Sequence, residues 1–73
     1  MTFEEQQLYH DAVGRLWEIV QIVRLHPGET LLLLRRHKPI TNLWAIAVDN
    51  GDDTATIMEK EGFTTIYAEE EKE

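Results

Sequence analysis

Residues 3–25 read FEEQQLYHDAVGRLWEIVQIVRL, and this stretch decides which fold class the sequence predicts. Its apolar residues recur at steps of three and four with polar residues between them, which is the spacing of an amphipathic helix. We therefore expect one long helix over residues 3–24. The apolar positions that carry this pattern are Tyr9, Ala12, Val13, Leu16, Val20 and Val23.

Signals at both ends of the stretch bear on this helix. Thr2 followed three residues later by Glu5 forms a capping-box pattern, which favours a helix start at this point. The segment His26-Pro27-Gly28 ends the helix, because proline cannot continue it and glycine permits a reversal. In the second half, however, Gly14 lowers the helix propensity and the β-branched residues of 19–23 also suit a strand.

Residues 30–36 and 43–49 are short, apolar segments separated by a polar linker that contains Pro39 and Asn42. This layout predicts an antiparallel hairpin. The four leucines of 31–34 place leucine on both faces of the first strand, since side chains alternate along a strand. Both faces of the hairpin are therefore apolar.

One hairpin face is expected to stay uncovered and to contact a partner, because helices on one side of a small sheet leave the other side open. In the second strand, alternation separates Trp44, Ile46 and Val48 from the other apolar residues. The face expected to bind the partner holds Leu31 or Leu33 with Leu43, Ala45 and Ala47. The alternative is that the short helix described next, or the amino-terminal segment, folds across it.

The carboxyl-terminal third predicts a turn at 49–53, a short helix from residue 53 or 54 to Glu61 ended by Gly62, and a strand at 63–68. A competing interpretation makes residues 54–60 a strand. The expected fold class is α+β, with one long amino-terminal helix packed on a three- or four-stranded, mainly antiparallel sheet in the order α-β-β-α-β. Residues 1–73 form one domain, and 69–73 form a frayed acidic tail.

The charge of the chain is unevenly distributed. The formal net charge is −7, and residues 49–73 carry all of the excess because acids and bases balance over residues 1–48. Such a field repels phosphate backbones and attracts basic protein surfaces, which argues against direct nucleic-acid binding. The absence of cysteine favours the cytoplasm, and no apolar run is long enough to cross a membrane.

Catalytic and metal-binding motifs are missing. The chain has neither serine nor cysteine, so the commonest nucleophiles are absent, and we expect no enzyme and no cofactor. The histidines lack a spacing suited to zinc, and the acidic segment 49–53 fails the calcium-loop pattern because its glycine stands third rather than sixth. The basic segment 35–38 is either a solvated turn or a weak phosphate contact.

In size, acidity and layout the chain resembles the small phage proteins, known from a Xanthomonas phage, that bind host RNA polymerase. The features that carry this resemblance are the 73-residue length, the start MTFEEQQLYHDAVGRLWEIV and the finish AEEEKE. The resemblance implies binding to the amino-terminal segment of the polymerase β′ subunit near the flap domain. It also implies inhibition of initiation and suppression of intrinsic termination, and it assigns no role to single residues.

The expected function is therefore a transcription regulator that binds host RNA polymerase by contact alone, without a small-molecule ligand. Two alternatives remain open: an acidic nucleic-acid mimic of the anti-restriction or anti-CRISPR type, and a small homodimeric structural module. The candidate partner-binding residues are Leu31, Leu33, Arg35, Arg36, Leu43, Ala45, Asp52, Asp53, Glu69 and Glu70.

Overall fold

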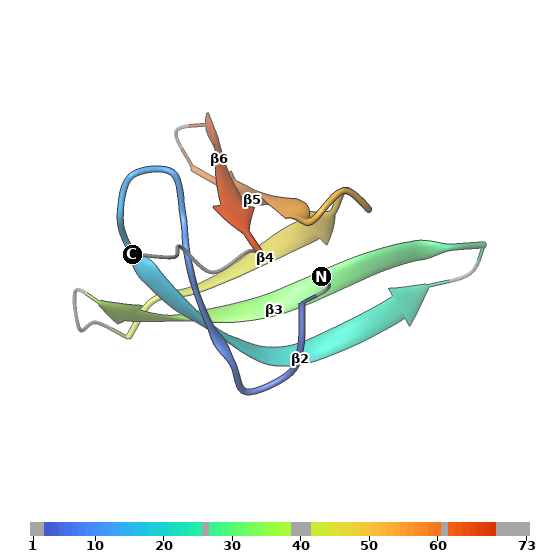
Figure 1. The fold of residues 1–73 in the computed structure, drawn as a ribbon, viewed down its shortest axis with the longest axis horizontal. Coiled ribbons are helices and arrows are strands. Elements are labelled where there is room, and N and C mark those ends of the chain that lie inside the picture. The colour runs from blue at the N-terminus through green and yellow to red at the C-terminus, as the bar shows by residue number, and fades with distance from the viewer. Residues whose placement is uncertain (1–2, 26, 39–41, 61, 69–73) are drawn as a thin grey trace.

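A computed structural model describes residues 3–25, 27–38, 42–60 and 62–68, and within them the fold is all-β (Figure 1). The expected α+β fold is wrong, because six antiparallel strands and no helix form in this part of the chain. The strands are β1 (Leu8–His10), β2 (Leu16–Leu25), β3 (Glu29–Lys38), β4 (Trp44–Asp49), β5 (Thr54–Glu59) and β6 (Gly62–Tyr67).

Each strand pairs with the next one along the chain, so the sheet order is β1-β2-β3-β4-β5-β6. The sheet curls into a half-barrel that brings its first and last strands together (Figure 1). Asp11, just after β1, forms an antiparallel bridge with Ile66 of β6, and the Ala12 backbone N–H donates to the Thr65 carbonyl at 2.8 Å. These contacts join the two edges at one end of the half-barrel.

The stretch expected to be the long helix instead forms β1, a tight turn and β2. Gly14 has a φ of +89°, a left-handed conformation that glycine adopts readily and that the reversal requires. Along β2, Trp17 and Ile19 are buried, and the register then shifts at Val20, so that Ile22 packs against the core.

The residues that carried the helical pattern are mostly outside the core: only Tyr9 among them is buried, whereas Val13 and Val23 are exposed. The periodicity misled because β2 has apolar residues on both of its faces, so a spacing of three and four could be found among residues that do not share one face.

Residues 54–59 form β5, so the short helix expected there is wrong and the competing strand interpretation is confirmed. Ala55 and Ile57 are fully buried between more exposed neighbours, which is the two-residue alternation of a strand. Gly62 does not end a helix. It lies opposite Glu59 in the hairpin between β5 and β6.

Two further sequence expectations are confirmed. The hairpin expected at 30–36 and 43–49 is β3 and β4, and the strand expected at 63–68 is β6. Thr2 of the expected capping box, Pro39 of the linker and the tail 69–73 lie outside the described residues.

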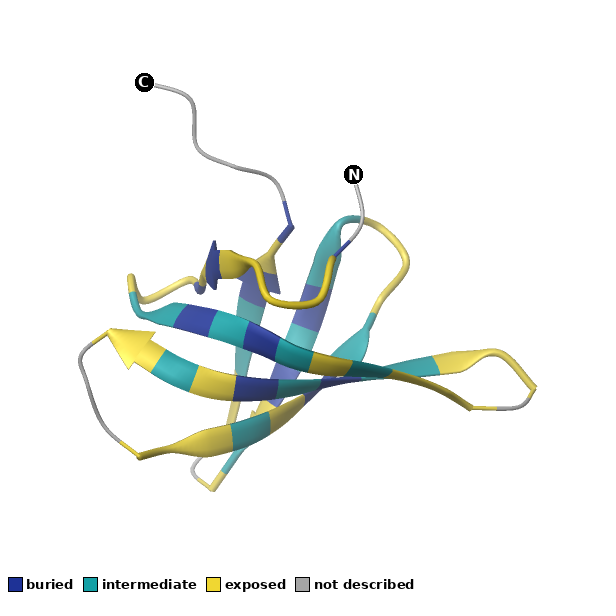
Figure 2. Cartoon of the chain, turned by 90° about the horizontal axis from the view of Figure 1, so that it is seen from below, coloured by how far each residue is buried: buried dark blue, intermediate teal, exposed yellow. Residues whose placement is uncertain are grey.

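Buried residues alternate with more exposed ones along the strands (Figure 2), so the core lies on one face of the sheet, the inner face of the half-barrel. Cross-strand neighbours point to the same face, so the register assigns each side chain to the inner or the outer side. No helix in the described part of the chain is long and apolar enough to cross a membrane. The buried apolar side chains are Phe3, Tyr9, Trp17, Ile19, Leu32, Leu34, Ala47, Ala55, Ile57, Ile66 and Ala68.

Candidate functional site

The outer face of the sheet carries a row of large apolar side chains that crosses four strands. Leu33 of β3 lies opposite Ile46 of β4, Ile46 lies opposite Met58 of β5, and Met58 lies opposite Phe63 of β6. Ile46 is 46% exposed, Met58 is 47% exposed and Phe63 is 76% exposed. Neighbours in such a row are within side-chain contact distance, so the row forms one continuous apolar strip open to solvent.

Two further groups widen this strip. Leu31 and Val48, opposite one another on β3 and β4, lie one step along the strands on the same side. Trp44, which is half-exposed, extends the strip in the other direction. We call these residues together the outer apolar face: Leu31, Leu33, Trp44, Ile46, Val48, Met58 and Phe63.

The charges beside Trp44 neutralise one another. The Arg35 guanidinium lies 5.7 Å from the Trp44 ring centroid and 2.6 Å from a carboxylate oxygen of Glu18. Because this pair is exposed, it contributes little to stability. The pair does, however, cancel the charge of Arg35 beside Trp44, at the border of the outer apolar face.

The sequence grouped the apolar hairpin residues on the wrong faces. Leu31 and Leu33 do lie on the outer side, but they lie opposite Val48 and Ile46 rather than beside Ala45. Ala45 lies opposite buried Leu34 and packs against the core, so it does not belong to the exposed surface. A difference of one residue in register exchanges the two faces of a strand, which explains the error.

The remaining candidate residues are scattered. Leu43 is 42% exposed and lies just before β4, where its carbonyl accepts a hydrogen bond from the Arg36 N–H of β3 at 2.8 Å. Arg36 points to the inner face, opposite Trp17. Asp52 and Asp53 lie in the turn between β4 and β5, where the Asp53 carbonyl accepts a hydrogen bond from the Ala68 N–H at 2.8 Å. Glu69 and Glu70 lie outside the described residues.

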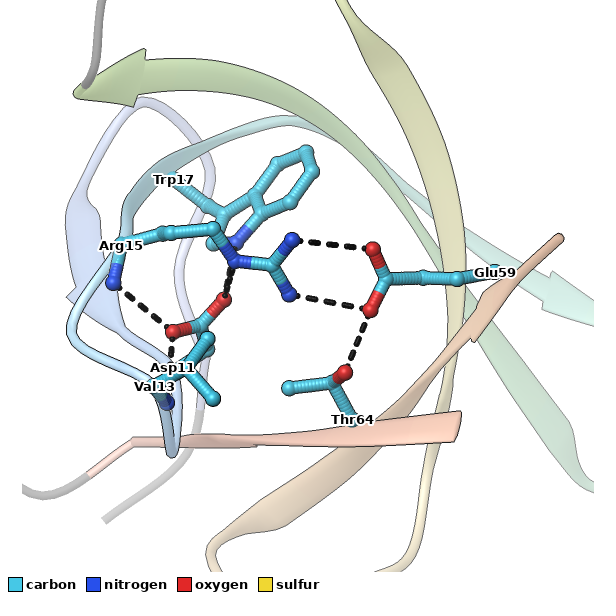
Figure 3. Close-up of polar contacts among 6 residues, drawn as sticks. All are labelled: Asp11, Val13, Arg15, Trp17, Glu59 and Thr64. Atoms are coloured by element: carbon cyan, nitrogen blue, oxygen red, sulfur yellow. Dashed lines mark hydrogen bonds and ion pairs between the residues drawn. The ribbon is translucent and has the colours of Figure 1, made fainter. Parts of the chain in front are cut away.

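A second candidate site lies on the inner side, where a polar cluster connects the β1–β2 turn to the β5–β6 hairpin (Figure 3). We call Asp11, Arg15, Trp17, Glu59 and Thr64 the Asp11 clasp. The Asp11 carboxylate accepts hydrogen bonds from the Trp17 indole at 2.8 Å and from the Arg15 Nε at 2.6 Å. Arg15 then binds both oxygens of Glu59, at 3.0 and 2.9 Å, and Thr64 donates to Glu59 as well.

The backbone of the turn adds to the clasp. The Arg15 N–H donates to the Asp11 carboxylate at 2.8 Å, and the Val13 N–H donates to the same oxygen at 3.1 Å. Each oxygen of Asp11 therefore accepts two hydrogen bonds, and buried carboxylates are stable in proteins when they are paired in this way. The clasp fixes the turn in the shape that lets β2 return beside β1.

The clasp keeps its acids ionised. Arg15 and then Thr64 lower the pKa of Glu59 from its ordinary value of 4.5 to about 2. Burial disfavours the charged form of Asp11, but hydrogen bonds from Trp17 and Arg15 outweigh it and leave the Asp11 pKa below its ordinary value. The hydrogen bond to Glu59 raises the pKa of Arg15. At neutral pH all three groups are charged.

Arg36 completes the inner cluster from β3. Its guanidinium lies 4.5 Å from the Trp17 ring centroid, on the indole that also lies near Arg15. The Arg36 Nε is buried without a hydrogen-bond acceptor, the only such side-chain atom among the residues that the structure describes. Burial and the nearby Arg15 lower the Arg36 pKa, and the cation–π contact with Trp17 offsets part of that cost.

A cavity of about 420 Å³ lies against the clasp. Two of its charged groups already bind one another, because the Arg15 guanidinium and the Glu59 carboxylate form two parallel hydrogen bonds. No group of three or more histidine or acidic side chains within the described ranges could hold a metal ion. The clasp is therefore suited to holding the two ends of the sheet together. The cavity is lined by Val13, Arg15, Glu59, Lys60, Gly62, Phe63 and Thr64.

Sequence reasoning missed most of the outer apolar face. The sequence did not assign Ile46, Met58 and Phe63 to this surface. The face on which they lie depends on pairings between β4, β5 and β6, and β5 was expected to be a helix. The alternation Thr54-Ala55-Thr56-Ile57, with β-branched residues at three of four positions, was the available signal for β5.

The geometry thus separates an inner face closed by its own contacts from an outer face that is apolar and open. Comparisons of the chain with protein-family models, with curated proteins and with solved structures find no match.

Proposed function

We propose that this protein is a non-enzymatic binding module that contacts another protein through the outer apolar face. The observation that carries the proposal is the apolar row Leu33–Ile46–Met58–Phe63, continuous across four strands and exposed at Ile46, Met58 and Phe63. Isolated exposed apolar side chains are ordinary on protein surfaces, whereas contiguous apolar patches are typical of interaction sites. The cytoplasm is the proposed location, on the strength of a chain without cysteine.

The size of the molecule is compatible with such an interface. Its two longer extents are 34 and 30 Å. A standard interface needs about 800 Å² from each partner, which a face of these dimensions accommodates. Aromatic side chains and methionine are enriched at protein interfaces, and this face presents Trp44, Met58 and Phe63 beside Ile46.

The net charge defines the partner more closely. A formal charge of −7 on a 73-residue chain attracts positively charged surfaces and raises the rate of encounter with them. Two copies of this chain repel one another by the same rule. The proposed partner is therefore a different protein, with an apolar contact region surrounded by basic residues.

Bacterial RNA polymerase is the first partner to test, because the resemblance described above implies it and because it suits an acidic regulator without catalytic groups. The proposed role is transcription regulation by docking, with inhibition of initiation and suppression of intrinsic termination as its expected consequences. The missing serine and cysteine nucleophiles and the fully engaged Asp11 clasp support a role without catalysis.

The test compares two variants that add the same positive charge to exposed apolar positions. Ile46→Lys changes the centre of the outer apolar face, and Val13→Lys changes the β1–β2 turn, where Val13 is 68% exposed. Each variant and the unchanged protein are titrated into purified RNA polymerase, and affinity is measured by biolayer interferometry. We expect Ile46→Lys to weaken binding at least tenfold and Val13→Lys to leave it within about twofold.

The possible outcomes distinguish a wrong binding surface from a wrong partner. Equal affinities for the two variants show that the outer apolar face is not the binding surface. Absence of binding by the unchanged protein rejects RNA polymerase, and the same variants then serve to evaluate any partner found by crosslinking.

A further inference from the structure

A second feature, which concerns backbone groups rather than a side-chain surface, is the free edge of strand β2, whose Val23 lies opposite Leu31 of the outer apolar face. β1 pairs with β2 only from Leu16 to Glu18, and the Gln7 carbonyl and Gln6 N–H extend the contact to Ile19. Beyond Ile19, β2 continues to Leu25 with β3 on one side and no strand from the described residues on the other. The β2–β3 hairpin projects from the body of the half-barrel as a two-stranded arm (Figures 1 and 2).

The first open position on this edge is closed by a side chain instead of a strand. The Ile22 backbone N–H donates to a carboxylate oxygen of Glu5 at 2.9 Å, on the exposed surface. In an antiparallel pair a carbonyl of the neighbouring strand would accept this hydrogen bond. The Glu5 carboxylate therefore stands in for the backbone of a missing strand.

The chain turns away from the edge at the residue that follows Glu5. Gln6 has a φ of 67°, a left-handed conformation that is uncommon for a residue other than glycine, asparagine or aspartate. This bend ends the backbone pairing with β2 and leaves only the Glu5 side chain to reach Ile22. A side-chain cap of this kind can be displaced without breaking the sheet.

Alternate residues of a strand direct their backbone groups to the same side, so the N–H and carbonyl of Arg24 point off the edge as those of Ile22 do. Between Ile22 and Leu25 the only polar side chain is Arg24, and two of the apolar side chains are open to solvent: Val23 is 38% exposed and Leu25 is 42% exposed. Exposed edges with apolar side chains are templates for strand addition.

We propose that the β2 edge from Ile22 to Leu25 binds an extended peptide segment of another protein as an added strand, and that Glu5 acts as a displaceable guard of this edge. The segment carries apolar residues against Val23 and Leu25 and a basic residue next to Glu5. Charge supports this occupant, because Glu4 and Glu5 are both exposed beside the edge and the whole chain has a net charge of −7. A second copy of the chain would bring like charges together at the same place.

The test uses an acetylated and amidated hexapeptide in which valine alternates with one lysine and two threonines, so that a single base can lie near Glu5 and none lies opposite Arg24. The peptide is titrated into isotope-labelled protein and followed by amide NMR and hydrogen exchange. We expect the amide signals of Ile22 and Arg24 to shift and the Arg24 amide to become protected from exchange. Arg24→Pro removes the outward donor, and proline is tolerated where an edge N–H faces solvent. This variant is expected to bind the peptide at least tenfold more weakly.

Two variants at Glu5 test whether its hydrogen bond to the Ile22 N–H competes with the peptide. Glu5→Gln and Glu5→Ala both lose the charge, but only Gln keeps an oxygen that can accept from Ile22. We expect Glu5→Ala to bind the peptide at least threefold more tightly than Glu5→Gln. This comparison also keeps the proposal testable if Arg24→Pro does not fold.

Three results overturn the proposal: equal affinity for the two Glu5 variants, a folded Arg24→Pro variant that binds the peptide as the unchanged protein does, or signal changes at Ile46 and Met58 in place of Ile22 and Arg24. Concentration-dependent dimerisation of Glu5→Ala in sedimentation would assign the edge to a second copy instead. The Ile46→Lys variant is expected to bind the peptide normally, so a failure here is distinguishable from a failure at the outer apolar face.

Discussion

Both faces of this sheet are rich in large apolar residues, but only the inner face is covered by contacts within the chain. On the inner face Trp17 and Ile57 are fully buried and the charges of the Asp11 clasp are paired. On the outer face Trp44 and Ile46 are half-exposed. A 73-residue half-barrel has enough chain to cover one side of its sheet, and this difference indicates that the other side is available to a partner.

The two tryptophans offer the largest test of this contrast. Trp17→Ala removes a buried ring, the indole donor to Asp11 and the surface beneath Arg36, so we expect it to lower the free energy of unfolding by about 3–5 kcal/mol. Trp44→Ala is expected to lower it by less than about 1 kcal/mol, because that ring is half in solvent. Urea unfolding followed by circular dichroism measures both. Equal losses would show that the outer face also belongs to the folding core.

Ile57 and Ile46 repeat the comparison with a smaller side chain. They occupy neighbouring strands on opposite faces, and Ile57 is fully buried whereas Ile46 is 46% exposed. We expect Ile57→Ala to lower the free energy of unfolding by about 2–5 kcal/mol and Ile46→Ala by under about 1 kcal/mol. Chemical unfolding of the two single variants and of the double variant checks this, with nearly additive losses expected for the double variant.

The Asp11 clasp makes the stability of the fold depend on pH. The folded-state pKa of Glu59 lies below its ordinary value, so its contribution to stability is complete above pH 4.5 and is lost as the pH falls toward about 2. Glu59→Gln is expected to lower the free energy of unfolding at pH 7 by about 1–3 kcal/mol and to flatten this decline. Thermal unfolding from pH 7 to pH 2 measures it. A variant whose profile parallels that of the unchanged protein assigns the acid sensitivity to other carboxylates.

The smallest effect on stability is expected at Phe63, the most exposed side chain of the outer apolar face. Phe63→Lys should change the free energy of unfolding by no more than about 0.5 kcal/mol, since 76% of the side chain is already in solvent. The same variant should reduce partner binding at least tenfold. A stability loss above 2 kcal/mol would instead place Phe63 in the folded core.

The sequence predicted the segments whose signals are local and missed those that depend on long-range pairing. The β3–β4 hairpin and β6 were correct, because short apolar runs between turn residues are typical of strands. β2 was taken for a helix because it has apolar residues on both faces, so Leu16, Val20 and Val23 showed helical spacing although none of them is buried. The β-branched residues of 19–23 and Gly14 were the contrary evidence within the same stretch.

The candidate surface was likewise predicted where the signal is local and missed where it depends on long-range pairing. Alternation correctly gave the hairpin two apolar faces, and Leu31 and Leu33 do lie on the outer one. Their neighbours could not be identified, because the register of β3 against β4 and the existence of β5 are properties of the assembled sheet. The Asp11 clasp joins Asp11 and Arg15 to Glu59, which lies 44 positions after Arg15 in the chain. No short sequence motif predicts a contact between residues so far apart.

Site-specific photocrosslinking in bacterial cells can decide whether the outer apolar face binds a partner, with a benzophenone amino acid placed at position 46 on that face or at position 13 in the β1–β2 turn. Both positions are exposed to solvent, and Ile46 lies away from the cavity that Val13 lines. We predict crosslinks from position 46 to one protein, at a site with apolar residues surrounded by basic ones, and none above background from position 13. Equal yields from the two positions, or crosslinks from position 13 alone, would show that the outer apolar face is not the binding surface.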